Sequence, residues 1–139
     1  IEQGEADAII SFELCEAARW LAYLKKGGLL ITGDQQIPPM PVITGAAEYP
    51  QDIPERIAQT GSRIQVVNAL ALAEQAGSAK AVNVVLMGVL SNLLEFDQAA
   101  WQQALETAVP ARFLKLNQQA FELGRAAGRN LLQQHKNQD

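Results

Sequence analysis

The stretch KAVNVVLMGVLSNLLEF, from Lys80 to Phe96, decides the fold. Its side chains are apolar nearly all the way round, and a helix without a polar face is buried on every side. The 14 residues between Lys80 and Glu95 would form a helix of about 21 Å, too short for a hydrocarbon core of roughly 30 Å. The stretch therefore predicts the central helix of a soluble core. Within it, Gly88 predicts a closely packed neighbour, and Asn83 predicts a buried amide that must find a partner.

The composition is that of an ordinary globular domain. With 139 residues and a net charge of −4, the chain can form one domain with a core and has no electrostatic footprint for nucleic acid or anionic lipid. Its single cysteine excludes an intrachain disulfide framework and a cysteine-ligated zinc or iron–sulfur site within the chain. The sequence shows neither a signal peptide nor a transmembrane run, so we expect a cytoplasmic protein.

Two strands and a helix are expected in the first part of the chain. Ala6–Phe12 is a short apolar run typical of a buried strand, and Leu14–Lys26 carries an apolar stripe at helical spacing. The Gly27-Gly28 pair predicts the end of this helix, and Leu29–Thr32 predicts the second strand. A strand, a helix and a strand with short connections form a βαβ unit, whose two strands are parallel.

The most irregular part of the chain, Gln35–Pro50, follows and holds four prolines. Because proline removes ladder donors, we expect at most a short extended piece there, around Pro41–Ile43. The elements predicted after it are a helix over Asp52–Thr60 with Asp52 as its N-cap, a third strand over Arg63–Val67, and a short helix over Asn68–Gln75.

The C-terminal third is predicted to be helical. Asp97 is a suitable N-cap for a helix over Gln98–Thr107, and an apolar stripe predicts a last helix over about Ala111–Gln134. Gly124 and Gly128, four residues apart, predict a close crossing with another helix or with the sheet. Strands followed by helices in this order indicate an α/β fold.

Three polar side chains follow directly after predicted strands. Glu13, Asp34 and Asn68 each lie just past the C-terminal end of one. Ligands and partners of parallel α/β sheets bind at that edge, so these residues could face a common crevice. In the alternative interpretation, Glu13 and Asn68 cap helices and Asp34 caps a turn. Asn83 either hydrogen-bonds a neighbouring loop or contacts a ligand or partner.

Cys15 and His135 are the only cysteine and histidine. A thiol in the first turn of a helix can become reactive, but Glu13 and Glu16 disfavour a thiolate at Cys15 and favour a small buried residue. His135 is near the C-terminus, where a solvated side chain is a simpler interpretation than a metal ligand or a proton donor. The sequence contains no Gly-x-Gly-x-x-Gly motif, P-loop or Ser-His-Asp set. It therefore carries no complete active site, and we expect it to need a partner.

Four separated segments resemble, in the right order, the γ-type chain of 2-oxoacid:ferredoxin oxidoreductases. They are GEADAIISFELCEAARWLAYLKKGG (Gly4–Gly28), IPPMPVITGAAEYP (Ile37–Pro50), GSAKAVNVVLMG (Gly77–Gly88) and LNQQAFELGR (Leu116–Arg125). The second and the fourth most resemble the branch of this family formed by the small β subunit of indolepyruvate ferredoxin oxidoreductase. The resemblance covers nearly the whole chain.

The resemblance implies a Rossmann-like three-layer α/β domain with a mainly parallel sheet and a helical C-terminal third. We assign this single domain to residues 1–132, followed by a polar tail over residues 133–139. The implied enzyme decarboxylates an aryl pyruvate oxidatively, uses coenzyme A as co-substrate and passes electrons to ferredoxin. Thiamine diphosphate and iron–sulfur clusters then belong to a large α subunit, and this chain supplies no catalytic, cofactor-binding or metal-ligating residue. In fused relatives the equivalent domain is associated with the coenzyme A side of the reaction.

In one respect the sequence departs from the family pattern. Family members begin with a strand and a Gly-rich turn, resembling Gly-x-Gly-Gly-Gln-Gly, before the segment at Gly4, whereas this sequence begins at Ile1. We expect that a first strand is missing and that an uncovered strand edge makes the isolated chain self-associate. Two other functions remain open. One is a free-standing small-molecule or nucleotide-binding module that uses the strand-end crevice, and the other is a structural dimerisation domain built on the C-terminal helix.

Overall fold

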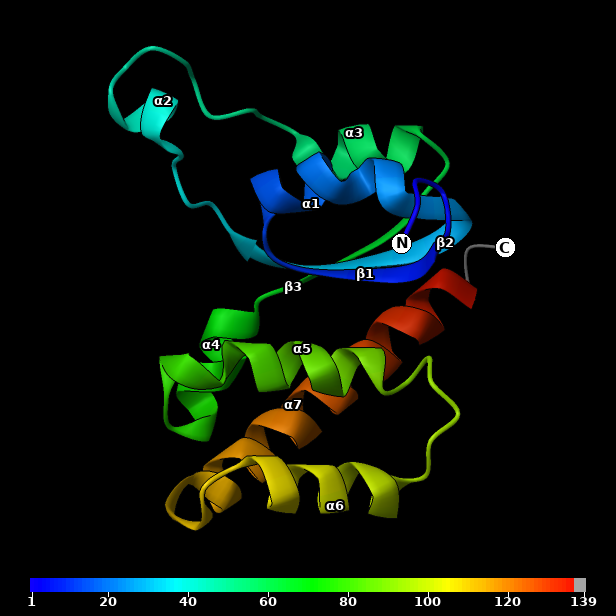
Figure 1. Cartoon of the computed structure of the whole chain (residues 1–139), viewed down its shortest axis with the longest axis vertical. Coiled ribbons are helices and arrows are strands. Elements are labelled where there is room, and N and C mark those ends of the chain that lie inside the picture. The colour runs from blue at the N-terminus through cyan, green and yellow to red at the C-terminus, as the bar shows by residue number, and fades with distance from the viewer. Residues whose placement is uncertain (137–139) are drawn as a thin grey trace. The chain divides into compact units, whose positions relative to one another are not determined.

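The computed structural model describes the backbone of residues 1–136 and the side chains of residues 1–129 (Figure 1). The chain forms two compact units, Ile1–Val67 and Asn68–Asp139. A parallel sheet with helices makes up the first unit, and the described part of the second is helical. The predicted α/β class with a helical C-terminal part is therefore confirmed, whereas the extent of the domain, residues 1–132, remains a prediction.

Three parallel strands make up the sheet of the first unit, in the order β1-β2-β3. They are β1 (Ala6–Glu13), β2 (Leu24–Gln35) and β3 (Arg63–Val67). At the carboxyl edge of the sheet, Glu13 pairs with Gln35, and Gly33 pairs with Val67. The predicted βαβ arrangement with parallel strands is confirmed, and all three strands end close to the same level.

β1 and β3 are the edge strands of this sheet. An edge strand presents unpaired backbone groups to which a further strand can pair. The expected self-association of the isolated chain depends on such an edge and remains a prediction.

Two helices and a 3-10 helix cover one face of the sheet (Figure 1). They are α1 (Leu14–Trp20), η1 (Leu21–Tyr23) and α3 (Ile53–Gln59). The core between them and the sheet contains the buried residues Leu14, Ala17, Leu24, Leu30, Ile53 and Ile57. Removal of this apolar surface from water, worth about 25 cal/mol per Å², is the main force that holds the helices on the sheet.

The first helical segment is shorter than the sequence predicts. The apolar stripe predicts a helix to Lys26, but η1 ends at Tyr23 and Leu24 begins β2, where it is buried in the core. The glycine pair lies in β2 at a bulge, where the register of β2 against β1 shifts. Gly27 has a φ of +77° there, a conformation that glycine adopts without strain. The glycines therefore bend a strand and do not end a helix.

Around the proline-rich segment, one local prediction is wrong and another holds only in part. The piece expected to be extended, Pro41–Ile43, lies in a short helix, α2 (Met40–Ile43). Proline fits the first turn of a helix because the amide at that position has no helical partner. Asp52 occupies the N-cap position of α3 as predicted, but its backbone is left-handed (φ 55°) and its side chain makes no capping hydrogen bond. Aspartate tolerates this conformation, so a bend of the backbone, and not a side-chain cap, precedes the helix.

Helices form the described part of the second unit. They are α4 (Ala69–Ala76), the 3-10 helix η2 (Ala79–Ala81), α5 (Val82–Leu90), α6 (Gln98–Ala108) and α7 (Ala111–Lys136). α7 continues past the expected end at Gln134. The side chain of His135 and residues 137–139 of the expected tail lie outside the described residues. None of the helices in the described part is both long and apolar enough to cross a membrane.

The central helix of the sequence analysis corresponds to α5, which is shorter and less enclosed than predicted. Leu86 is fully buried, but Asn83 is exposed and Met87 is 41% exposed, so one face of α5 meets solvent. The prediction of a buried amide at Asn83 is therefore wrong. Just past the end of the helix, the Ser91 hydroxyl donates to a backbone carbonyl one turn earlier (2.6 Å), a bond that competes with helical hydrogen bonding.

α5 and α7 cross with almost no space between their backbones, because glycines line the contact. A Cβ atom on Gly124 would lie 1.9 Å from the Val85 carbonyl oxygen, and one on Gly88 would lie 2.1 Å from the Phe121 carbonyl oxygen. Gly128 also faces the backbone of α5. The predicted close approach at Gly88 and the predicted crossing at Gly124 and Gly128 are confirmed, and the element crossed is a helix.

Candidate functional site

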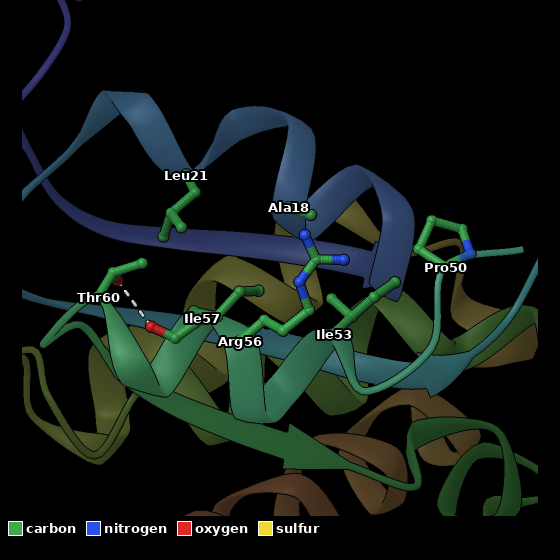
Figure 2. A pocket seen from close by; sticks show the side chains of 7 residues that line it. All are labelled: Ala18, Leu21, Pro50, Ile53, Arg56, Ile57 and Thr60. Atoms are coloured by element: carbon green, nitrogen blue, oxygen red, sulfur yellow. Dashed lines mark hydrogen bonds between the residues drawn. The ribbon is translucent and has the colours of Figure 1, made fainter.

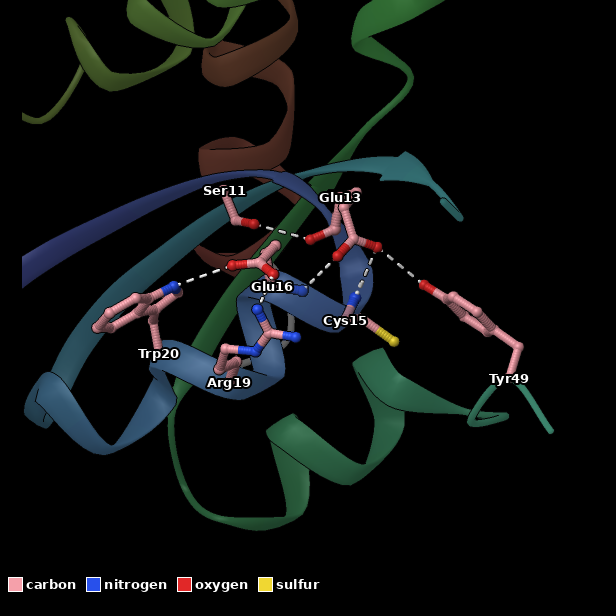
Figure 3. A network of polar contacts seen from close by, with 7 residues as sticks. All are labelled: Ser11, Glu13, Cys15, Glu16, Arg19, Trp20 and Tyr49. Carbon is pink, nitrogen blue, oxygen red and sulfur yellow. Dashed lines mark hydrogen bonds and ion pairs between the residues drawn. The ribbon is translucent and has the colours of Figure 1, made fainter. Parts of the chain in front are cut away.

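Glu13 is a buried glutamate at the carboxyl edge of the sheet, where β1 passes into α1; the residue is only 6% exposed. Its Oε1 accepts a hydrogen bond from the Glu16 amide (2.5 Å). Its Oε2 accepts from the Cys15 amide (2.9 Å) and from the Tyr49 hydroxyl (3.0 Å) (Figure 3). The Ser11 hydroxyl donates to the Glu13 carbonyl (2.7 Å). A carboxylate can be buried here because donors surround it.

These bonds define what Glu13 can do. Two of its donors are backbone amides of the first turn of α1, which have no partner within the helix. The alternative interpretation of Glu13 as a helix cap is therefore confirmed. Both carboxylate oxygens are occupied, so Glu13 is a structural residue in this arrangement and not a free general base.

Glu13 also closes a loop. Gln35, the last residue of β2, pairs with Glu13 in the sheet, and Tyr49 bonds to the Glu13 carboxylate. We call residues 36–48 the proline arm. The arm contains α2 and is held at both ends beside one buried residue (Figure 1, Figure 3).

Tyr49 is a site residue that the sequence analysis missed. It is partly buried, and this burial, together with the neighbouring Cys15 and Glu13 side chains, raises the pKa of its hydroxyl above the ordinary value of 10.0. A lone tyrosine between a glutamate and a proline in an irregular segment gives no periodic signal, so only the fold reveals its partner. Tyr49 lies in the segment Ile37–Pro50 that resembles the family, but the resemblance implies no role for it.

The raised pKa of Tyr49 predicts a loss of stability in alkali. A pKa that is higher in the folded state gives stability that is fully present below the unfolded pKa of about 10 and is lost as the pH rises toward the folded value. We expect urea midpoints of the wild-type chain to fall above pH 10 more steeply than those of Tyr49→Phe. Tyr23→Phe serves as a matched control. Equal slopes for the wild type and Tyr49→Phe would contradict the prediction.

The other predicted site residues do not form one cluster in a single unit. Asp34 lies within β2, one residue before its end, and not past the strand or in a turn as predicted, because β2 continues beyond Thr32 to Gln35. Its side chain is exposed at the same sheet edge as Glu13. Asn68 begins the second unit, and its Oδ1 accepts from the Ala71 amide (3.0 Å), so its interpretation as a helix cap is confirmed. Asn83 is exposed on α5. A crevice shared by these residues, and their contact with a partner, remain predictions.

Cys15 lies partly buried against the core of the first unit. This position agrees with the interpretation of a small packed residue. Among the residues that the structure describes, no three His, Cys, Asp or Glu side chains are grouped so that they could hold a metal ion.

A cavity of about 260 Å³ lies between α1 and α3 (Figure 2). Its lining residues are Ala18, Leu21, Pro50, Ile53, Arg56, Ile57 and Thr60. Arg56 is the charged residue among these lining residues. The Thr60 hydroxyl donates to the Ile57 carbonyl (2.7 Å). Such a pocket suits a small apolar group with a negative charge and offers no nucleophile.

Comparison with known proteins places the chain in a family. Residues 1–127 match the family described as "Pyruvate ferredoxin/flavodoxin oxidoreductase". Two proteins named "Indolepyruvate oxidoreductase subunit IorB", from Thermococcus kodakarensis and Pyrococcus horikoshii, are 39% and 36% identical over 137 residues, covering 95% of this chain and 68% of each relative. The crystal structure of the keto/oxoacid ferredoxin oxidoreductase gamma subunit from Geobacter sulfurreducens matches with a TM-score of 0.68 and 20% identity over 94% of this chain and 65% of that chain, a likeness of fold.

The chain spans about two thirds of the length of these relatives. The matched residues 1–127 contain all four segments that carry the family resemblance, and that resemblance is confirmed. The chain belongs to the pyruvate ferredoxin/flavodoxin oxidoreductase family.

Proposed function

We propose that the chain is the small subunit of an oxidoreductase that acts on an aryl pyruvate such as indolepyruvate. The complex oxidatively decarboxylates this 2-oxo acid in the presence of coenzyme A and passes the electrons to ferredoxin, in the cytoplasm. The observation that carries the proposal is the 39% identity over 137 residues to a protein named as an indolepyruvate oxidoreductase subunit.

In this proposal the reactive groups belong to the large subunit. Iron–sulfur clusters do not fit this chain, because Cys15 is its one cysteine and a cluster takes four thiolates. The buried carboxylate of Glu13 is occupied by three donors, which supports a structural role for the strand-end residues. Following the family resemblance, we assign thiamine diphosphate and the clusters to the partner and expect the chain alone to be inactive.

The cavity between α1 and α3 favours a second candidate, a free-standing module that binds a small anionic molecule or nucleotide. Arg56 is the residue of this cavity that would contact the anion. In that case the isolated chain binds such a ligand without any large subunit, and Arg56→Ala weakens the binding. Lys26→Ala removes an exposed cation elsewhere in the first unit and is the control.

Co-expression tests the main proposal. The chain is produced with the large subunit of an indolepyruvate ferredoxin oxidoreductase, and the large subunit carries the affinity tag. We expect the two to co-purify in equal amounts and to reduce ferredoxin in the presence of indolepyruvate and coenzyme A, whereas the chain alone shows no turnover. Absence of a complex, or turnover by this chain alone, would defeat the proposal.

A further inference from the structure

The proline arm presents large apolar side chains to solvent. Ile37, Met40 and Ile43 are 58%, 66% and 66% exposed. Scattered single apolar residues are normal on protein surfaces, but these three lie within seven consecutive residues, two of them in α2. A cluster of this kind indicates a surface that another molecule covers.

The arm is also restrained before it meets a partner. Its two ends are fixed beside Glu13, by strand pairing at Gln35 and by the Tyr49 hydroxyl. Within it, Pro38, Pro39 and Pro41 restrict the backbone. A restrained segment loses little conformational entropy on binding, so its contacts contribute more of their energy to affinity.

The charges around the arm restrict its partner. No lysine or arginine occurs between Lys26 and Arg56. The exposed acidic residues Asp34 and Glu48 lie at the two ends of the arm. An acidic electron carrier, a nucleic acid or an anionic lipid surface needs cations to bind, so this surface does not suit them. Its complement is an apolar groove with basic residues at the rim.

We propose that the proline arm docks in an apolar groove with a basic rim on the large catalytic subunit. Met40 and Ile43 enter the groove, and Asp34 and Glu48 face the rim. The inference depends on the proposed function, because it takes the large subunit as the occupant. It assigns the exposed strand-end residue Asp34 to the interface and leaves Glu13 and Tyr49 as positioning residues that hold the arm.

The dissociation constant of the complex between this chain and the large subunit tests the inference. The double variant Met40→Ala/Ile43→Ala is expected to bind about 100-fold more weakly, as for two anchor residues at the centre of an interface. Met87→Ala removes an exposed methionine of the second unit and is expected to bind like the wild type. Glu48→Lys is expected to weaken binding about fivefold at low salt and to flatten its salt dependence, because it removes an attraction to the rim.

Two further readouts separate docking from folding and from chemistry. The thermal unfolding midpoints of the variants are expected to equal that of the wild type, because the replaced side chains are exposed. At saturating concentrations of a variant, kcat is expected to return to the wild-type value, since the arm supplies contact and no reacting group.

The outcomes are distinct. If the wild-type chain does not bind the large subunit, both the proposed function and the inference fail. If the wild type binds and supports turnover, but the arm variants bind equally well, the inference alone is overturned. If the arm variants abolish self-association of the chain and leave the complex intact, the occupant is a second copy and the inference is likewise overturned.

Discussion

Gly124→Ala is expected to destabilise the second unit by about 3 kcal/mol. Intrinsic helix propensity alone would favour alanine by about 1 kcal/mol. Close packing counteracts this gain in helix propensity. The new Cβ would lie 1.9 Å from the Val85 carbonyl oxygen, and its other near neighbours are also backbone atoms of Val85. Because backbone cannot rotate aside as a side chain does, the two helices must separate and lose part of their buried contact.

Chemical unfolding followed by Trp101 fluorescence in a Trp20→Phe background measures this effect in the second unit. Gln119 lies on the exposed side of the same helix. The control variant Gln119→Ala is therefore expected to change the free energy of unfolding by less than about 0.5 kcal/mol. Gly88→Ala, whose Cβ would lie 2.1 Å from the Phe121 carbonyl oxygen, is expected to behave like Gly124→Ala. If Gly124→Ala stabilised the second unit instead, helix propensity would outweigh close packing at the crossing of α5 and α7.

This crossing also indicates which features of the fold a sequence can reveal. Glycines four residues apart on an apolar stripe have few explanations other than close packing, and the prediction at Gly124 and Gly128 is confirmed. The strand Arg63–Val67 has the predicted bounds, because its residues alternate at first and then close with the apolar pair Val66-Val67. Signals of this kind are local and have one physical cause.

The wrong predictions have signals with more than one cause. A glycine pair such as Gly27-Gly28 is compatible with a helix end or with a strand bulge. Because Leu24 is buried in the core as the first residue of β2, the glycines form the bulge. A nearly all-apolar stretch indicates burial but not its completeness, so Asn83 and Met87 lie on an exposed face of α5. At Asp52 the left-handed backbone conformation decides whether the side chain caps the helix, and residue type alone does not indicate that conformation.

The candidate site was only half visible in the sequence. Glu13 could be singled out because it follows a strand and precedes a helix, and its capping role could be stated as an alternative. Its bond to Tyr49 joins residues 36 positions apart, and no periodicity connects them. The sequence predicts that the proline arm is irregular, but the closure of the arm at one buried residue is a property of the folded chain.

Glu13→Ala is expected to destabilise the first unit by about 3 kcal/mol, the sum of separate losses. Removal of an N-cap costs roughly 0.5–2 kcal/mol. The Tyr49 hydroxyl loses its acceptor, which costs about 1 kcal/mol or more for a partly buried group, and the vacated volume adds a cavity penalty. Glu13→Gln keeps the volume and one acceptor oxygen but places amide protons against donors, so we expect a loss of about 1–2 kcal/mol.

The matched control for this prediction is Glu16→Ala, three residues along the same helix. Glu16 accepts hydrogen bonds from the Arg19 guanidinium and the Trp20 indole at the surface, and exposed pairs of this kind contribute about 0–1 kcal/mol. Hydrogen exchange at the Cys15 and Glu16 amides gives a local readout, because these amides donate to the Glu13 carboxylate. In Glu13→Ala their protection should fall along with global stability. If Glu13→Ala costs no more than Glu16→Ala, the bond between the Glu13 carboxylate and Tyr49 does not restrain the proline arm, and the docking inference loses one of its two restraints.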